Sequence, residues 1–509
     1  MDRPPSPPPE LTGVVSTDPD ARRSVAGSRG PIWMVPAAVA RPRHIDEVAA
    51  VVAWCAAEGL PLTPRGAGTG MPGGNVGRGL VLDLTAMDGL ELRADGAMVA
   101  GAGAVAATAD ALARERSRHF PALPSSAPWC TFGGMISTDA AGARTFSYGP
   151  THRWTDALRV VMSDGSIQTL RREAAPADSA PWAGLHATLR SLELPAPPAV
   201  RKNVSGYAVD RFLATGDPID LIAGSEGTLV VVAEGTFRTE PLPESQGVAL
   251  VGVPELDALP ELTARAESSG ASACEYFGRR LLELGRLLDD PRVSRLDVRA
   301  GALLVEYAGS PEHVAAGLAL WDDEAITASD PETVGEIWGL RHAASPSIAH
   351  AAGDRRSIQF IEDAAVPRSA LPAYLRGVQA ALDRHGVDAV LFGHAGDGHL
   401  HINPLIDLRL PEWKETVRGV MEEVIDLVAE LGGTLSGEHG DGRIRAGGLA
   451  RIWSAPHCRA FRAVKAALDP QGLLNPGVVL GEQAADPLEG LAEGPDLQRL
   501  VKPILPSTD

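Results

Sequence analysis

Short hydrophobic runs, alanine-rich helical segments and glycine turns alternate along residues 31–241. Apolar side chains recur at helical spacing in Ile45–Gly59, which predicts an amphipathic helix, and the strand predicted over Leu60–Thr63 follows it. Two more strands are predicted at Leu80–Leu84 and Ala97–Ala100. This rhythm of short elements indicates a first domain that ends near the Pro-Leu-Pro sequence at residues 241–243.

A longer rhythm of strands and helices follows in residues 242–480, and it predicts a second domain. We expect α+β architecture with an antiparallel sheet covered on one side by helices. The predicted helices lie near Pro254–Ser269, Arg279–Leu288, Pro311–Ile326, Glu332–Ala349 and Leu371–His385, and the predicted strands are Ala273–Phe277, Ala302–Tyr307, Ser357–Glu362, Ala389–Phe392 and Leu400–Pro404. The proline-rich residues 1–30 are expected to be a disordered lead-in, and residues 481–509 an acidic tail.

Composition narrows the class of protein. The chain has 509 residues, a net charge of -19 and 44% hydrophobic residues, which is typical of a soluble globular protein and argues against nucleic acid or an anionic membrane as partner. Four scattered cysteines without a CxxC pair favour a reducing compartment and exclude an ordinary cysteine-ligated iron–sulfur cluster. No secretory signal and no apolar run of ~18–20 residues is present, so a cytoplasmic protein without a membrane span is expected.

Two histidine-bearing segments carry the most specific chemistry, FGHAGDGHLHIN at 392–403 and SGEHGDG at 436–442. In the strand that follows the first glycine turn, His399, His401 and Asn403 alternate onto one face, and His394 can fold back onto it. Glu438 and His439 lie on the second glycine-bracketed turn. Three imidazoles, a carboxylate and a spare histidine predict a metal or catalytic site, but their spacing leaves open a zinc hydrolase.

Glycine-rich loops indicate a second binding function. PRGAGTGMPGGN at 64–75 contains GxGxxG, but the next element is a strand rather than a helix, so a nicotinamide-binding turn is disfavoured. Successive free N–H groups in such a loop can still surround phosphates. PSSAPWCTFGGMISTDAAG at 124–142 and GSEGT at 224–228 are similar in character. Together these loops favour close approach to a large flat ligand.

In motif order, these segments resemble the FAD-linked oxidases with a vanillyl-alcohol-oxidase (PCMH) type flavin domain. Within them, the chain looks like the branch of D-lactate, glycolate and D-2-hydroxyglutarate dehydrogenases. The resemblance implies an FAD-binding domain over 31–241 and a substrate domain over 242–480. It implies non-covalent FAD, because the flavin loop lacks a histidine. The implied FAD contacts are Pro64, Arg65, Gly66, Ala67, Gly68, Thr69, Gly74, Asn75, Pro124, Ser125, Gly133, Gly134, Ser137, Thr138, Gly142, Glu226, Gly227 and Asn475.

The resemblance also assigns roles in the second domain. His394, His401 and Glu438 would bind a divalent metal, expected to be zinc, and His439 would be the general base. Substrate contacts would come from Arg341, Asn403 and His399, although His399 also suits a fourth metal ligand or an outer partner.

The expected activity is oxidation of a D-lactate-like acid, or glycolate, with hydride transfer to flavin N5. Electrons would pass to a quinone or an electron-transfer protein, and a homodimer is possible. The family's dicarboxylate enzymes carry a lysine where this chain has Gln359–Asp363, which weakens the reading as a D-2-hydroxyglutarate dehydrogenase. The same motifs would also suit a nonredox flavoprotein of this superfamily, or a flavoprotein subunit that depends on a partner.

Overall fold

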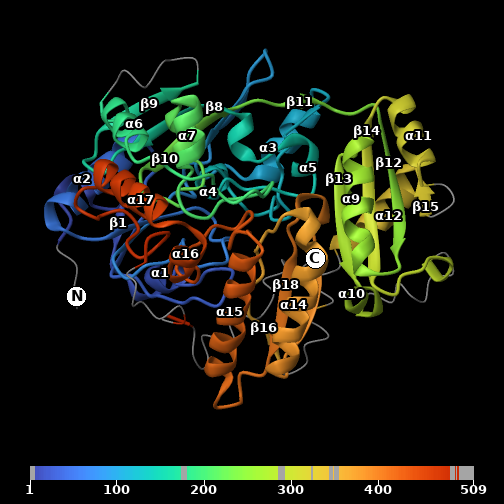
Figure 1. Cartoon of the computed structure of the whole chain (residues 1–509). Coiled ribbons are helices and arrows are strands. Elements are labelled where there is room, and N and C mark those ends of the chain that lie inside the picture. Colours follow the sequence, from blue (N-terminus) through green and yellow to red (C-terminus); the bar gives the residue numbers. More distant parts are fainter. Residues whose placement is uncertain are drawn as a thin grey trace.

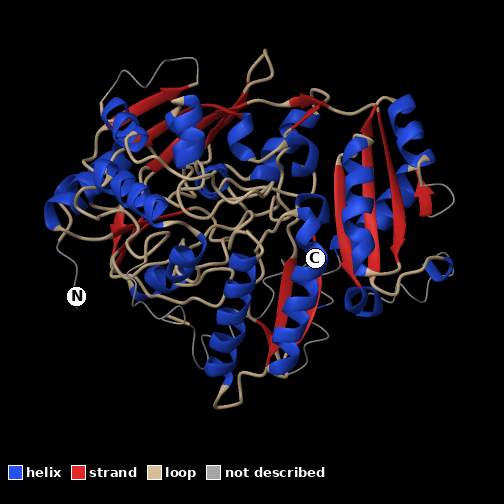
Figure 2. Ribbon diagram, viewed as in Figure 1, coloured by secondary structure: helices blue, strands red, loops and turns tan. Residues whose placement is uncertain are grey.

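The computed structural model describes residues 6–172, 180–284, 293–321, 325–342 and 355–481, with the single positions 348, 488, 490 and 491. Two sheets built from residues 15–237 and one seven-stranded sheet built from residues 245–406 lie on opposite sides of the molecule (Figure 1). Loops fill most of the region between them (Figure 2). Helices with largely antiparallel sheets confirm the predicted α+β class.

The first sheet is four-stranded, and its order is β1-β2-β4-β3. Strands β2, β4 and β3 run parallel, so β3 and β4 end at the same edge, where the glycine-rich loop begins. The apolar face of helix α2 (Ile45–Glu58) packs into the same hydrophobic cluster as these strands. The strands are β1 (Val15–Ser16), β2 (Ala38–Ala40), β3 (Leu62–Arg65) and β4 (Leu80–Asp83).

The second sheet is antiparallel and five-stranded, with the order β5-β6-β10-β8-β9. Helices surround it, and α17 near the end of the described chain returns to pack beside α6. The strands are β5 (Leu90–Leu92), β6 (Met98–Gly101), β8 (Thr155–Val161), β9 (Ile167–Arg171) and β10 (Val231–Phe237). The helices are α3 (Ala106–Arg114), α4 (Phe132–Thr138), α5 (Thr145–Tyr148), α6 (Trp182–Arg190), α7 (Val209–Thr215), α8 (Pro218–Ile222) and α17 (Ala455–Leu468).

The third sheet is antiparallel throughout, with the order β15-β12-β14-β13-β17-β18-β16. Its strands are β12 (Ser245–Val253), β13 (Ala273–Gly278), β14 (Gly301–Gly309), β15 (Ala325–Ala328), β16 (Arg356–Ser357), β17 (Asp388–Gly393) and β18 (His401–Ile406).

The two faces of this third sheet have different neighbours. One face buries residues such as Val251 and Ile402 beneath α9 (Leu259–Ser268), α11 (Pro311–Ala319), α14 (Leu371–Arg384) and α15 (Trp413–Glu430). The opposite face carries Phe392 and Leu405 and packs against α10 (Arg279–Leu284) and α12 (Pro331–His342). His401 and Asn403 alternate onto this second face together with Leu405, as predicted, whereas His399, predicted on the same face, precedes the strand. No described helix is long and apolar enough to cross a membrane.

Several predicted elements differ from the structure. The helix predicted to reach Ile326 ends at Ala319, and Ala325–Ala328 forms edge strand β15 because β12 offers it a pairing partner. The strand predicted over Ser357–Glu362 is reduced to β16, and the long strand β12 was not predicted. Part of the helix predicted over Glu332–Ala349 and most of the tail at 481–509 lie outside the described residues.

The lead-in at residues 1–30 was expected to be disordered, and its described part is not. Strand β1 pairs with β2, and helix α1 (Pro19–Ser24) follows. Asp18 caps this helix by accepting hydrogen bonds from the backbone N–H groups of Asp20 and Ala21, and Pro19 suits the first helical position.

A buried carboxylate connects the two halves of the molecule, the part built from residues up to 241 and the part with the seven-stranded sheet. Glu306 lies in the middle of β14 with no exposed surface. It accepts two hydrogen bonds from Arg144 of the first half, at 2.8 and 2.7 Å, and one each from Ser272 Oγ and Trp338 Nε1, both at 2.8 Å. One charged side chain thus accepts hydrogen bonds from three residues in different parts of the chain.

We expect Glu306→Gln to lower the free energy of unfolding by about 2–3 kcal/mol, because an amide cannot accept from every donor and leaves Arg144 without its counter-charge. The midpoint of thermal unfolding measures this effect. Arg299→Gln is the control, since Arg299 pairs with Asp297 at the exposed surface. An unchanged midpoint for Glu306→Gln would contradict the role of this residue.

Candidate active site

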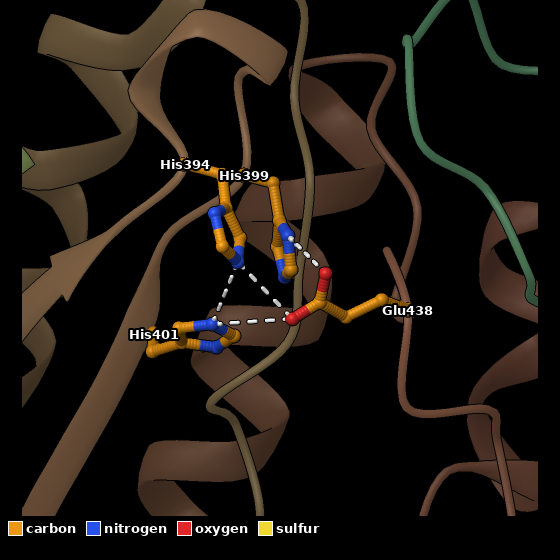
Figure 3. A group of neighbouring side chains, drawn as sticks. All are labelled: His394, His399, His401 and Glu438. Carbon is orange, nitrogen blue, oxygen red and sulfur yellow. Dashed lines mark hydrogen bonds and ion pairs between the residues drawn. The ribbon is translucent and has the colours of Figure 1, made fainter. Parts of the chain in front are cut away.

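Three histidines and one glutamate meet where the turn between β17 and β18 faces the Gly437–Gly442 loop (Figure 3). His394 Nε2 lies 3.4 Å from His401 Nε2 and 3.2 Å from Glu438 Oε1. Glu438 Oε1 is also 3.4 Å from His401 Nε2. One potential ligand atom from each of these residues and from His399 lies within 4.8 Å of all the others. The structure thus brings the predicted metal ligands together.

His399 belongs to the same group but has a different environment. Its side chain is completely buried, and its Nε2 lies 2.9 Å from Asp363 Oδ1. Among the described residues its buried Nδ1 has no hydrogen-bond partner, and it lies 3.9 Å from Glu438 Oε2. Such an orphaned nitrogen beside a carboxylate fits a metal site. His399 does not line the cavity described below, so its position favours a ligand or supporting role over the predicted substrate contact.

The neighbours of these groups set different protonation states. Burial lowers the pKa of His401 to about 3, so this imidazole is neutral at physiological pH. For His394, burial is outweighed by the Glu275 carboxylate, which raises its pKa to about 9. For Glu438, burial is likewise outweighed, and Lys202 and His394 hold its pKa well below the usual range. Neutral imidazole and ionised carboxylate are the ligand forms that a borderline divalent metal binds, so His401 and Glu438 already have the required form, whereas His394 would release a proton on binding.

Glu275 links the histidine–glutamate cluster to Arg341, the predicted substrate-binding arginine. His394 Nδ1 lies 2.6 Å from Glu275 Oε1, and Arg341 Nε donates to Glu275 Oε2 at 2.8 Å. The guanidinium of Arg341 also lies over the Phe392 ring, 4.5 Å from its centre. Glu275 was not predicted, although a glutamate inside the buried strand β13 is a signal that the sequence does contain.

Asn403 and Arg341 border the same cavity as His394 and His401. Asn403 Nδ2 donates to the carbonyl of Val390 at 3.3 Å, which orients the amide on the sheet. The predicted substrate contacts Arg341 and Asn403 are therefore both positioned to face a ligand in this cavity.

His439 lies at the edge of the cluster, with its side chain 21% exposed toward the cavity. Its ring stacks on that of His401 with centroids 5.2 Å apart. Its Nδ1 is 3.2 Å from Glu362 Oε1 and 3.2 Å from Asp363 Oδ1. These carboxylates raise the pKa of His439 against the opposing effect of burial. Since Nδ1 faces them, Nε2 is the nitrogen left to exchange a proton with a ligand.

Neither Glu362 nor Asp363 was predicted as a site residue. Asp363 Oδ2 accepts from the backbone N–H of His439 at 2.9 Å, and Glu362 Oε1 accepts from Arg445 Nη2 at 2.5 Å. Arg445 is itself buried. The acidic pair directly before an apolar run was visible in the sequence, but its partners were not.

A cavity of about 2630 Å³ joins this cluster to the glycine loops of the first half. It exceeds the ~300–1,000 Å³ of most ligand pockets. Every predicted FAD contact except one lines it: Pro64, Arg65, Gly66, Ala67, Gly68, Thr69, Gly74, Asn75, Pro124, Ser125, Gly133, Gly134, Ser137, Thr138, Gly142, Glu226 and Gly227. The exception, Asn475, lies behind the wall, where its Nδ2 donates to the carbonyls of Gly74 and Glu226 at 2.6 and 2.8 Å.

The loop from Gly66 to Asn75 fits an anionic cofactor. Within the described residues, no backbone N–H of this loop donates a hydrogen bond to the protein. Arg65 lies beneath it, where its Nη1 donates to the carbonyl of Asn75 at 3.0 Å. Unused N–H groups beside a cationic side chain are what a pyrophosphate binds. The residues present therefore fit FAD.

Glu226 joins the flavin loop to the loop that carries Glu438 and His439. Its Oε1 accepts from the backbone N–H groups of Asp441 and Gly442 at 2.7 and 3.0 Å. On the other side it packs so closely against Gly74 that a Cβ there would lie 2.5 Å from Oε2. Burial and the Asp441 carboxyl raise the pKa of Glu226 to about 8.

Comparisons with known proteins identify FAD-binding families and relatives, in agreement with the flavin loops of this cavity. The FAD binding domain family matches residues 36–171, and the C-terminal domain of FAD linked oxidases matches residues 242–479. A D-2-hydroxyglutarate dehydrogenase of Xanthomonas citri pv. viticola is 31% identical, covering 87% of this chain and 89% of that protein. A D-lactate dehydrogenase of Archaeoglobus fulgidus is 28% identical, covering 87% of this chain and 91% of that protein.

Among solved structures, 4-ethylphenol oxidase from Gulosibacter chungangensis has a TM-score of 0.68 at 15% identity, covering 93% of this chain and 96% of that one. This likeness extends the agreement to the fold of both halves. The chain belongs to the FAD-linked oxidases, as its motifs predicted, and is an FAD-binding oxidoreductase with the PCMH-type fold. Family membership favours a flavin enzyme over the zinc hydrolase that the histidine spacing had left open.

The raised pKa of Glu226 predicts a specific pH dependence of stability. The folded chain binds this proton more tightly than the unfolded chain, whose glutamates titrate near ~4.3. The stabilisation is complete below that value and is lost as pH rises through about 8. We therefore expect the thermal midpoint of Glu226→Gln to fall less than that of the wild type between pH 6 and 8.5. Glu234→Gln, in the outer part of β10, should retain the wild-type slope; parallel slopes for all three proteins would contradict the assignment.

Proposed function

We propose that this protein oxidises a D-2-hydroxy acid of the D-lactate type, or glycolate, to the 2-oxo acid. The observation that carries the proposal is a single cavity bordered by both the flavin loops and the histidine–carboxylate cluster. The names of the two relatives support the substrate class, since one is called a D-lactate dehydrogenase and the other a D-2-hydroxyglutarate dehydrogenase.

Arg341 is proposed to bind the substrate carboxylate. Its Nε is held by Glu275 and its plane by the Phe392 ring, so the remaining guanidinium edge has a defined direction. A planar fork of donors suits a carboxylate and restricts which face of the substrate meets the flavin. Asn403 lies on β18, next to the strand β17 that carries Phe392, and is proposed to orient the substrate by a further hydrogen bond.

His439 is proposed to accept the hydroxyl proton at Nε2, while Nδ1–H donates to Glu362 or Asp363 and stabilises the charge that develops on the ring. FAD bound in this cavity would supply a hydride acceptor, and a divalent metal, for which we propose zinc, would supply a Lewis acid that lowers the pKa of the hydroxyl. His394, His401 and Glu438 are the proposed metal ligands, and His399 is a candidate fourth.

D-2-hydroxyglutarate is a second candidate substrate. The lysine expected in a dicarboxylate enzyme is absent, and Glu362 of that stretch is engaged by Arg445. However, Arg355 and Arg356 line the same cavity and introduce positive charge there, although Arg355 lies 3.6 Å from Asp388. The second carboxylate of such a substrate would therefore have cationic groups within the same cavity.

The electrons are proposed to leave through a separate acceptor, a quinone or an electron-transfer protein, because the chain has no cysteine cluster to hold a further redox centre. The described cysteines are all free, which fits a reducing compartment such as the cytoplasm. A homodimer is compatible with this function but not required by it.

Anaerobic reduction of the bound flavin tests the proposed function. Purified zinc-replete protein is mixed with D-lactate, L-lactate, glycolate and D-2-hydroxyglutarate, and the flavin absorbance is followed. We expect D-lactate or glycolate to bleach the flavin faster than L-lactate, since Arg341 and the flavin present one face of the substrate. Faster bleaching by D-2-hydroxyglutarate would favour the second candidate. No bleaching by any 2-hydroxy acid would refute the proposal and favour a nonredox or partner-dependent flavoprotein.

His439→Ala should slow flavin reduction by about 10²–10⁴-fold, the usual contribution of a general base, while FAD stays bound. Stopped-flow absorbance measures the rate, and the flavin-to-protein ratio measures retention. His385→Ala is a matched control, because His385 lies at the end of α14 and pairs with Glu423 at 3.0 Å. Equal rates for the two variants would show that His439 is not the base.

A further inference from the structure

Lys202 belongs to the FAD-binding part of the chain, and its side chain extends to the cluster of His394, His399, His401 and Glu438. It lies between α6 and α7, and its side chain is only 3% exposed. Its Nζ is 2.9 Å from Glu438 Oε2, 3.4 Å from Asp397 Oδ2 and 3.5 Å from the carbonyl of Gly142. Glu438 Oε2 and the Gly142 carbonyl accept hydrogen bonds from the ammonium group, and Asp397 adds an ion pair, so the side chain is held in one place.

The two oxygens of Glu438 consequently face different partners. Oε1 faces the imidazole nitrogens, at 3.2 Å from His394 Nε2 and 3.4 Å from His401 Nε2. Oε2 points away from them toward Lys202, with His399 Nδ1 as its next neighbour at 3.9 Å. Only Oε1 is directed at the point where the Nε2 atoms of His394 and His401 converge.

We propose that Lys202 is a positioning residue that reserves Glu438 Oε2, so that Glu438 binds the metal through Oε1 alone. This inference rests on the proposed metal site. The ammonium also places a positive charge beside the metal, which weakens metal binding but leaves the metal more electron-deficient. Lys202 thus lowers the affinity of the site for the metal and increases the ability of the bound metal to acidify the substrate hydroxyl.

The residue type supports this role. Lysine donates from a compact group and can engage one oxygen, whereas the planar fork of arginine tends to engage both oxygens of a carboxylate. The neighbouring Arg201 shows the contrast. It contacts Asp397 Oδ1 at 3.1 Å and lies over the Phe146 ring, and it does not touch Glu438. Of these two adjacent cations, only Lys202 acts on the metal-binding carboxylate.

A merely structural role makes the opposite prediction. If Lys202 serves only to neutralise Glu438 and Asp397, its removal should disrupt the cluster and weaken metal binding. If it acts as proposed, its removal frees Oε2 and withdraws a repelling charge, so that metal binding becomes tighter. The sign of the change in metal affinity therefore separates the two roles.

The test compares the FAD-loaded wild type with Lys202→Met and, as a matched control, Arg201→Met. Zinc affinity is measured by chelator competition, and the coordination of a Co²⁺ substitute by its visible absorption. We expect Lys202→Met to bind zinc at least 10-fold more tightly. We also expect its Co²⁺ bands to weaken, as they do when a four-coordinate ion gains a ligand, while flavin reduction by the substrate slows by 10-fold or more. Arg201→Met should match the wild type in all three measurements.

Weaker or unchanged zinc binding by Lys202→Met would overturn the proposal, and so would a wild-type protein that binds neither ion. If Lys202→Met does not fold, Lys202→Gln replaces it, because an amide keeps a donor to Oε2 without the charge. This variant should bind zinc more tightly with unchanged Co²⁺ bands, and weaker binding would again overturn the proposal. Should no 2-hydroxy acid reduce the wild-type flavin, the proposed function fails, while the metal measurements still decide the role of Lys202.

Discussion

The Gly437–Gly442 loop is the constraint on which the site depends, because it presents Glu438 and His439 and is held from both halves of the molecule. From the sheet side, Asp363 accepts the backbone N–H of His439. From the flavin side, Glu226 accepts the N–H groups of Asp441 and Gly442, and Lys202 pairs with Glu438. Movement of one half relative to the other would break these bonds between buried partners, which is energetically costly. The loop thereby sets the distance between the flavin loops and the histidine cluster.

Buried charge is the second organising feature. Several carboxylates with almost no exposed surface surround the cluster, and each is paired with a cation or a histidine: Glu275, Glu362, Asp363, Asp397 and Glu438. Because their partners differ, chemically identical imidazoles acquire different properties. His401 is neutral, whereas Glu275 favours the charged form of His394. These different environments suit the different roles proposed for the imidazoles of one cluster.

Local elements were predictable where their periodicity is complete within one segment. Helices α2 and α14 and strand β17 lie close to their predicted bounds, since each has a clear apolar face or a short run between turn signals. Strand β12 was missed because it is buried on both faces and lacks the alternation that identifies a half-exposed strand. Residues 325–326 were assigned to a helix because the pairing with β12 that makes 325–328 a strand is a long-range interaction.

By itself the sequence determined the motifs of the site, since the glycine loops and the two histidine segments each combine several informative residues within a few positions. It therefore predicted the flavin loops, His394, His401 and Glu438, which the structure brings to one cavity. Only the tertiary structure identified Lys202, Glu275 and Asp363 as their partners. Each is a single charged residue without a motif, and its hydrogen bonds join positions from 36 to 236 residues apart. A buried charge is stable only beside a counter-charge. Which residue supplies that counter-charge depends on the tertiary fold and cannot be deduced from the neighbouring sequence.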